Sequence, residues 1–315
     1  MKLGFLYAGQ GSQHPGMGAD LYEAYPAFRA VIDSAQVDFD LKEVSFTDSQ
    51  GVINQTRYTQ PCMVAFAAGL TAVLREQGVT PAVAAGLSLG EYSALHAAGV
   101  FDAAQAVKLV AFRGKAMEEA AAGRESAMIA VLGLDRAPLQ EACEEAGSLG
   151  CVVIANYNCP GQLVIGGEKA AAAVDRAGEL AKAAGAKRVL PLKVSGPFHT
   201  PLMAPAGAAL EEYFRSVTFA QPQIPVIFNC LGDVKDDSTP IQELLVKQVQ
   251  SSVFMEDSIR KMADMGVDAI VEIGPGKVLS GFIKKIDKSI KTYAVQDCDS
   301  LAAAISALKG AMQNV

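Results

Sequence analysis

Short apolar runs alternate with longer alanine-rich stretches along much of this chain. The runs at 3–8, 81–87 and 268–274 have the length and the small or branched side chains of buried strands. The stretches at 60–76 and from Asp102 to Gly123 repeat apolar residues at helical spacing. Alternating strands and helices predict an α/β fold with a mostly parallel sheet.

The middle of the chain, from Glu125 to Val194, follows a different order. We expect strand, helix, strand, strand, helix and strand, which is the ferredoxin-like β-α-β-β-α-β unit. The expected strands are 126–134, 151–158, 162–167 and 186–194, and the expected helices are 137–146 and 168–185. This predicts a small domain, 125–195, inserted into a large domain that comprises 1–124 and 196–315.

Composition narrows the class of protein. Half of the 315 residues are hydrophobic, which is enough for a well-buried core, and the net charge of −7 argues against non-specific nucleic-acid binding. No run approaches the roughly 18 apolar residues of a membrane span, and the first residues read as a strand rather than a signal peptide. Six scattered cysteines show no metal-ligand spacing and are expected to be free buried thiols. We expect a cytoplasmic monomer without a metal site.

One serine lies where a nucleophile is expected. Gly86-Leu87-Ser88-Leu89-Gly90 has the Gly-x-Ser-x-Gly form and joins a predicted strand to a predicted helix. Small flanking residues let the backbone turn tightly, and the N–H of Leu89 can receive negative charge that develops on a substrate oxygen. The alternative is a serine that only caps the helix on a glycine-rich turn.

A serine hydroxyl needs a base to take its proton, and the chain holds three histidines. His96 lies on the same predicted helix as Ser88, roughly 12 Å further along the axis, and cannot reach the hydroxyl. His14 lies in an early glycine loop and has no evident orienting group. His199, set between two prolines where the chain leaves the predicted small domain, is the favoured base, and a structural loop histidine is the alternative.

The loop from Gly9 to Gln13 follows the first predicted strand and lets the backbone approach a ligand closely. It is a candidate for the second oxyanion donor. The alternative is a nucleotide-binding loop, but His14 stands where a dinucleotide fingerprint needs its third glycine, and no strand-end acidic residue follows about 20 positions later.

Arg113 is the most informative charged residue. On a helix that turns by about 100° per residue, Lys108, Lys115 and Glu119 share one face and Arg113 projects from the opposite, apolar face. A buried guanidinium needs an anion, and its planar fork suits a carboxylate. Two hypotheses stay open: an internal salt bridge, or a substrate that carries a free carboxylate.

Seven features follow one another from Gly9 to Gly281: GQGSQ, TQP, GLSLGEYSALHAAG, the inward Arg113, NCPGQ, SGPFHTPLM and EIGPGKVLSG. Together they resemble the malonyl-CoA:acyl carrier protein transacylases over nearly the whole chain. The resemblance implies an α/β-hydrolase-like large domain with a ferredoxin-like insertion and an active site between the two.

The resemblance also implies roles for individual residues. Ser88 would be the acylated nucleophile, His199 its base, and Arg113 the residue that holds the malonyl carboxylate. The backbone N–H groups of Gln10 and Leu89 would form the oxyanion hole.

Three further positions follow from the resemblance. The carbonyl of Gln248 would orient the histidine in place of an acid, which accounts for the lack of an evident third triad member. Phe198 matches the bulky residue that related polyketide acyltransferases carry when they choose malonyl over methylmalonyl. One departure is Leu87, since the family usually has histidine before the nucleophile.

The implied reaction moves a malonyl group from malonyl-CoA to the phosphopantetheine thiol of an acyl carrier protein, in fatty-acid or polyketide synthesis, without a cofactor of its own. One rival is a serine thioesterase or carboxylesterase with the same elbow, and Arg113 and the insertion speak against it. A second rival is a non-catalytic nucleotide-binding protein.

An acyl carrier protein is expected to be acidic, so docking onto an acidic enzyme needs a local basic surface. The dense basic cluster of the chain is Lys284, Lys285, Lys288 and Lys291. The alternative is a solvated helix end and loop.

Overall fold

The chain divides into two compact units, each described here by itself. The computed structural model describes residues 1–170 and 172–313. The first unit comprises Met1–Gly114, Phe219–Phe228 and Arg260–Val315, and the second comprises Lys115–Thr218 and Asn229–Ile259. The segment expected as the small domain, 125–195, falls wholly within the second unit, but that unit extends further, and the domain boundaries 1–124, 125–195 and 196–315 stay a prediction.

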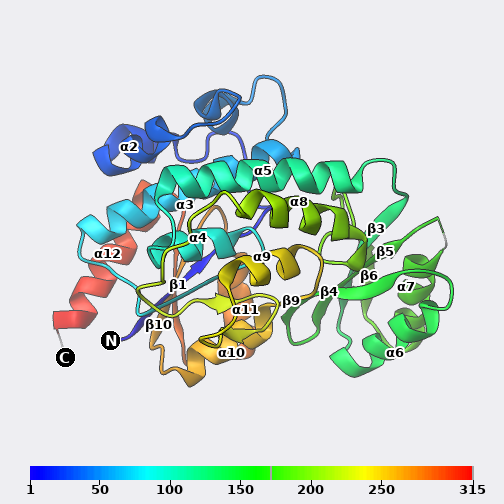
Figure 1. The fold of residues 1–315 in the computed structure, drawn as a ribbon. Helices are drawn as coiled ribbons and strands as arrows, with labels where there is room; N and C mark the ends of the chain where they lie inside the picture. Colours follow the sequence, from blue (N-terminus) through cyan, green and yellow to red (C-terminus); the bar gives the residue numbers. More distant parts are fainter. Residues whose placement is uncertain (171, 314–315) are drawn as a thin grey trace. The chain divides into compact units, whose positions relative to one another are not determined.

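The first unit is built on a four-stranded parallel sheet in the order β11-β10-β1-β2. Figure 1 labels its strands β1 and β10. Its strands are β1 (Leu3–Tyr7), β2 (Val83–Gly86), β10 (Ala269–Ile273) and β11 (Lys291–Val295). Tyr7 lies opposite both Ile273 and Gly86 in the register, so the carboxyl ends of β1, β2 and β10 lie level with one another. The predicted α/β class with a mostly parallel sheet is confirmed.

Helices complete the first unit. They are α1 (Ala19–Ala24), α2 (Pro26–Ser34), the π-helical turn η1 (Glu43–Thr47), α3 (Thr56–Glu76), α4 (Gly90–Ala97), α11 (Val278–Ile286), α12 (Cys298–Gln313), the first part of α5 (Ala103–Ala121) and the last part of α10 (Met255–Asp264). Helix α3 starts four residues before the expected Gln60. Pro61, a residue type that is common in the first turn of a helix, lies inside it. Among the described residues, no helix is both long and apolar enough to cross a membrane.

The second unit contains the expected ferredoxin-like arrangement. Its elements are β3 (Ser126–Leu132), α6 (Arg136–Ala146), β4 (Val152–Cys159), β5 (Gln162–Glu168), α7 (Ala173–Ala183) and β6 (Arg188–Pro191). These strands pair antiparallel in the order β6-β3-β5-β4. Apolar side chains of one sheet face, such as Ile129 and Ile165, pack against those of α6 and α7. Helix α7 is shorter than the expected 168–185, of which residue 171 lies outside the described residues.

The second unit also contains elements from later in the chain. They are the 3-10 turn η2 (Pro201–Met203), α8 (Ala204–Phe214), β8 (Asp233–Val234), α9 (Ile241–Val249), β9 (Val253–Phe254) and the first part of α10 (Met255–Asp264), while β7 (Ile227–Phe228) belongs to the first unit. Strand β9 adds to the antiparallel sheet by pairing parallel to β4. The sequence pattern does not predict this fifth strand.

Side-chain contacts attach the β9 region to the ferredoxin-like sheet. The Phe254 ring stacks on Tyr157 with centroids 4.9 Å apart, and the Arg136 guanidinium lies 4.9 Å from the Tyr157 ring centroid. Arg136 also makes two hydrogen bonds to the carboxylate of Asp257, at 3.0 and 2.8 Å. Strand β9, which follows α9, is therefore held on the sheet by strand pairing and by a stacked aromatic pair, and the start of α10 is held by an ion pair to α6.

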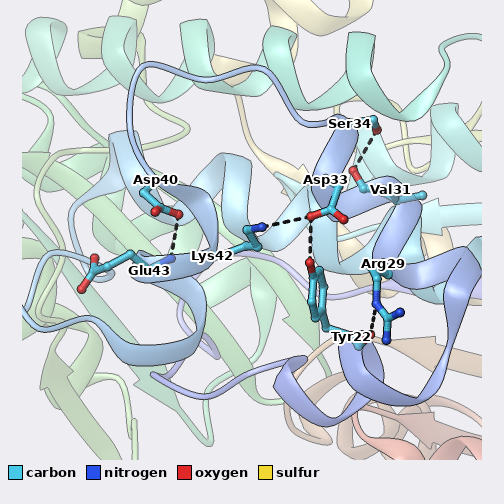
Figure 2. A network of polar contacts seen from close by, with 8 residues as sticks. All are labelled: Tyr22, Arg29, Val31, Asp33, Ser34, Asp40, Lys42 and Glu43. Carbon is cyan, nitrogen blue, oxygen red and sulfur yellow. Dashed lines mark hydrogen bonds and ion pairs between the residues drawn. The ribbon is translucent and has the colours of Figure 1, made fainter.

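A polar network orders the helical segment 19–47 of the first unit (Figure 2). The Tyr22 hydroxyl donates to Asp33 Oδ1 at 2.9 Å, and Lys42 Nζ lies 3.1 Å from the same oxygen. These hydrogen bonds hold the pKa of Asp33 below its ordinary value, and the bond from Tyr22 has the larger effect. Arg29 donates to the Tyr22 carbonyl at 3.0 Å, so α1, α2 and the start of η1 are tied together at the surface.

A buried carboxylate caps helix α11. Glu272 on β10 is 1% exposed, and its two oxygens accept the backbone N–H groups of Leu279 at 2.9 Å and Ser280 at 2.7 Å. These groups belong to the first turn of α11, where N–H groups have no partner within the helix. The charge also lies at the positive end of the helix dipole, which stabilises it.

We expect Glu272→Gln to lower the free energy of unfolding by about 1–3 kcal/mol, because the amide cannot accept both N–H groups with equal strength and leaves one poorly satisfied in the core. Urea unfolding followed by circular dichroism measures this. Glu76→Gln, at the exposed last residue of α3, is the control and should change stability by less than about 0.5 kcal/mol. Equal stability of the two variants would show that the cap contributes nothing.

Candidate active site

Ser88 lies on a sharp turn between β2 and α4. Its φ angle is 51°, in the left-handed region that few residues with a side chain adopt. The N–H of Leu87 donates to the carbonyl of Tyr7 at 2.9 Å, so the turn continues the hydrogen bonding of β2 with β1. This is the backbone of a nucleophile elbow, which presents the serine at the carboxyl edge of a parallel sheet.

The glycines on either side of the serine are required by close packing. A Cβ atom on Gly86 would lie 2.0 Å from the carbonyl carbon of Gly90, and a Cβ on Gly90 would lie 2.3 Å from the carbonyl oxygen of Tyr7. Both contacts are with backbone, which cannot swing away as a flexible side chain can. The Gly-x-Ser-x-Gly pattern therefore has a steric cause in this structure.

The elbow and the loop after β1 each carry a backbone N–H group that can act as a donor. A Cβ on Gly9 would lie only 2.6 Å from the carbonyl oxygen of Leu87, so the loop after β1 contacts the elbow closely. Gln10 is the next residue of that loop, and Leu89 follows the nucleophile. Within the part of the chain that the structure describes, neither backbone N–H donates a hydrogen bond. Both are available to a ligand oxygen.

The loop that carries Gln10 is anchored by its own side chains. Gln10 Nε2 donates to Thr56 Oγ1 at 3.0 Å, at the first residue of α3. Gln13 Nε2 donates to Asn54 Oδ1 at 2.8 Å, and Gln13 Oε1 accepts the N–H of Gly11 at 2.7 Å. The glutamines of the GQGSQ motif thus hold the loop in place.

Arg113 on α5 points into the first unit, as its helix position predicts. Its side chain is fully buried, and Nη2 donates to Ser88 Oγ at 3.3 Å. The guanidinium carbon lies 5.4 Å from the ring centroid of Tyr92 on α4. A Cβ on Gly114 would lie 2.8 Å from the carbonyl oxygen of Thr56, so α5 packs closely on the start of α3. These contacts bring a buried cation to the candidate nucleophile.

The surroundings of Arg113 are unusual for a charged group. Burial lowers the pKa of its guanidinium from the ordinary value, and Tyr92 and the buried Glu91 act in the opposite direction. Burial also raises the pKa of the Tyr92 hydroxyl. An arginine keeps its charge in such a place and attracts an anion, most strongly a carboxylate that fits its planar fork.

His199 lies in the second unit and is held by a helix carbonyl. It is 4% exposed, and Nδ1 lies 2.9 Å from the carbonyl oxygen of Gln248 in the last turn of α9. A carbonyl oxygen only accepts, so Nδ1 carries the proton and the neutral ring keeps its basic lone pair on Nε2. The negative end of the helix dipole stabilises the imidazolium that forms when Nε2 takes a proton.

Phe198, next to His199, is 8% exposed. A Cβ on Gly196 would lie 3.1 Å from its ring and 2.6 Å from the side chain of Ala121, so the ring is packed in a tight corner of the second unit.

The other two histidines have different surroundings. His14 is exposed, and His96 is bonded through Nδ1 to the carbonyl of Phe101, with a pKa that burial lowers.

The structure thus groups the residues that the sequence singled out into two sets. The first unit holds Ser88, Arg113, Gln10 and Leu89, and the second holds His199, Phe198 and Gln248. Sequence reasoning missed Tyr92 beneath the guanidinium and Thr56 beneath the loop. A signal for Tyr92 was present, since it lies four residues after Ser88, at the spacing of one helical turn.

Known proteins resemble this chain in both sequence and fold. Residues 4–310 match the family model described as acyl transferase domain. Malonyl CoA-acyl carrier protein transacylase from Bacillus subtilis is 42% identical over 311 residues, 98% of each chain. The crystal structure of malonyl CoA-acyl carrier protein transacylase from Clostridium perfringens is 38% identical with a TM-score of 0.95, over 99% of this chain and 98% of that one.

A third relative was solved as a complex. It is a malonyl-transacylase bound to its type II PKS acyl-carrier protein, 39% identical with a TM-score of 0.92, over 97% of this chain and 99% of that one.

Gly86→Ala tests the steric account of the elbow. The added methyl meets the backbone of Gly90, so we expect a loss on the order of 3 kcal/mol in the free energy of unfolding. Gly281→Ala is the matched control, because a Cβ there has no atom within 4 Å. It should gain about 0.5–1 kcal/mol, as alanine does over glycine inside a helix. Thermal and urea unfolding of both variants measure the difference, and a harmless Gly86→Ala would refute the account.

Proposed function

Because the chain belongs to the acyl transferase domain family, we propose that it moves a malonyl group from malonyl-CoA to the phosphopantetheine thiol of an acyl carrier protein through an ester on Ser88. One observation carries the proposal: Ser88 stands on a left-handed elbow with the buried Arg113 guanidinium 3.3 Å from its hydroxyl oxygen. A nucleophile beside a carboxylate-binding cation suits an acyl group that ends in a carboxylate.

In the first half of the reaction, Ser88 Oγ attacks the thioester carbonyl of malonyl-CoA while His199 Nε2 takes the hydroxyl proton. The N–H groups of Gln10 and Leu89 bind the oxygen as it becomes negative. The C–S bond then breaks, the imidazolium returns its proton to the departing sulfur of coenzyme A, and malonyl-serine remains.

The second half runs the same chemistry with another thiol. The phosphopantetheine thiol of the carrier loses its proton to His199 and attacks the ester carbonyl, and the same two N–H groups bind the oxyanion. The C–O bond breaks, the proton passes to Ser88 Oγ, and malonyl-carrier leaves. Since coenzyme A and the carrier present the same kind of thiol, one site serves both halves.

The reaction as proposed uses only these side chains and backbone N–H groups, and its independence of a metal or cofactor remains our proposal. The monomeric state and the cytoplasmic location likewise stay predictions. A serine hydrolase of the same fold would carry out the first half and then admit water, so the fate of the acyl-enzyme separates the two functions.

The first test of the proposal is intact-mass measurement. Malonyl-CoA should add one malonyl mass to the chain, and added holo-carrier should remove it and acquire it. Ser88→Ala should take up none, since no other residue stands on the elbow. A persistent adduct in Ser88→Ala would refute the nucleophile, and release of the malonyl group without a carrier would indicate the hydrolase.

Arg113→Ala should reduce malonyl selectivity, because it removes a bidentate charge-assisted contact with the substrate carboxylate. We expect malonyl binding to weaken by roughly 2–5 kcal/mol, while the kcat/KM for acetyl-CoA rises relative to that for malonyl-CoA. Arg113→Lys should recover part of the loss, since a point charge cannot reproduce the fork.

The companion variant Phe198→Ser should admit an α-methyl branch and leave the carboxylate contact intact. The measurement for both positions is kcat/KM for malonyl-, methylmalonyl- and acetyl-CoA. If Arg113→Ala slows all three thioesters equally, Arg113 is a structural residue and the malonyl preference has another origin.

The lysine cluster that runs from the end of α11 to the start of β11 is our proposed carrier docking surface, since all four of its lysines are exposed and an acidic carrier needs a basic surface. The double variant Lys284→Glu/Lys285→Glu should raise the KM for the carrier, most strongly at low salt, with self-acylation by malonyl-CoA unchanged. Lys108→Glu/Lys309→Glu reverses the same amount of charge elsewhere and is the control. Equal carrier kinetics in both double variants would exclude the cluster.

A further inference from the structure

The segment that carries His199 holds a backbone conformation that its sequence does not favour. His199 has a φ angle of 61°, in the left-handed region, although the residue is not glycine. Such a conformation costs free energy and persists where surrounding contacts impose it. The contacts of the neighbouring residue, Thr200, supply that constraint.

Thr200 is fully buried and makes hydrogen bonds through both its side chain and its backbone. Its hydroxyl donates to the carbonyl of Pro197 at 2.6 Å, which closes a turn across Phe198 and His199. In addition to this side-chain contact, its backbone carbonyl accepts the N–H of Met203 at 3.0 Å, at the end of η2. The residue after the histidine is therefore fixed on both sides of the turn.

The methyl group of Thr200 explains a glycine in the ferredoxin-like sheet. Gly166 lies in the central strand β5, paired with Met128 on β3 and Val153 on β4. Its φ lies outside the left-handed range, so the backbone does not require glycine there. A Cβ at this position would lie 2.9 Å from Thr200 Cγ2, closer than two such carbons approach without displacement. The missing side chain makes room for Thr200.

We propose that Thr200 is a positioning residue for His199. Its methyl group packs on Gly166, so the ferredoxin-like sheet fixes the position of the imidazole ring. All of these contacts, and the bond from His199 to Gln248, lie within the second unit. The inference rests on the proposed role of His199 as the base. Proton transfer needs the base within about 2.6–3.2 Å of its partner, so small displacements of the ring slow the reaction.

A compensating pair of substitutions tests this. Gly166→Ala places a methyl group against Thr200 Cγ2 and should lower the single-turnover rate constant of acylation by roughly 10- to 100-fold, with half-saturation by malonyl-CoA unchanged. Thr200→Ser keeps the hydroxyl and removes that methyl group, so it should lose little. The double variant Gly166→Ala/Thr200→Ser has room for the new methyl group and should return to within about threefold of the parent rate.

Gly178→Ala is the control for crowding of the same sheet. A Cβ there would meet Val189 and Ile129, on the face that α6 and α7 cover, and the rate constant should not change. If Gly166→Ala fails to fold, Thr200→Val replaces it, because it keeps the shape and removes the donor to Pro197. Thr200→Val should then be slow where Thr200→Ser is not.

His199→Ala in the same assay separates the two proposals. If it acylates at the parent rate, His199 is not the base. If it is slow while Gly166→Ala and Thr200→Val are normal, or if the double variant is as slow as Gly166→Ala alone, the positioning role of Thr200 is wrong.

Discussion

The left-handed backbone at Ser88 is the constraint on which the rest of the site depends. Glycine is needed at 86 and 90 because backbone atoms of the elbow and of β1 occupy the space of any side chain. The same crowding extends to Gly9, whose loop lies against the elbow and continues into Gln10. A tightly packed turn at the end of a parallel sheet thus presents a serine, and the loop before Gln10 packs against that turn.

The two units contribute different chemistry to the proposed reaction. The first unit supplies groups that bind negative charge: a buried guanidinium and two N–H groups. The second supplies a histidine whose tautomer is set by the carbonyl of Gln248. A carbonyl at the end of a helix stabilises the imidazolium without an acidic residue, so a carboxylate is not required in that role. In the first unit the buried Glu91 offsets part of the charge of Arg113, and the malonyl carboxylate is the partner proposed for its planar fork.

Much of this could be predicted from the sequence, and the exceptions have physical causes. Alternating apolar runs predict both sheets, and helix periodicity places Arg113 inside, because burial of apolar faces dominates these choices. The left-handed φ of His199 has no local signal, since it is imposed by Thr200 and by the sheet beneath it. Strand β9 is too short for its pattern to be recognised, and its pairing with β4 joins two segments that are far apart in the chain.

The most direct test of the proposed site is a crystal structure of the malonyl-enzyme, trapped without carrier protein. The ester should form on Ser88 Oγ, with its carbonyl oxygen within hydrogen-bonding distance of the Gln10 and Leu89 N–H groups. The free carboxylate should meet both terminal nitrogens of Arg113. An ester carbonyl that points away from these N–H groups, or a malonyl carboxylate that lies in solvent while Arg113 keeps its present contacts, would refute the proposed arrangement.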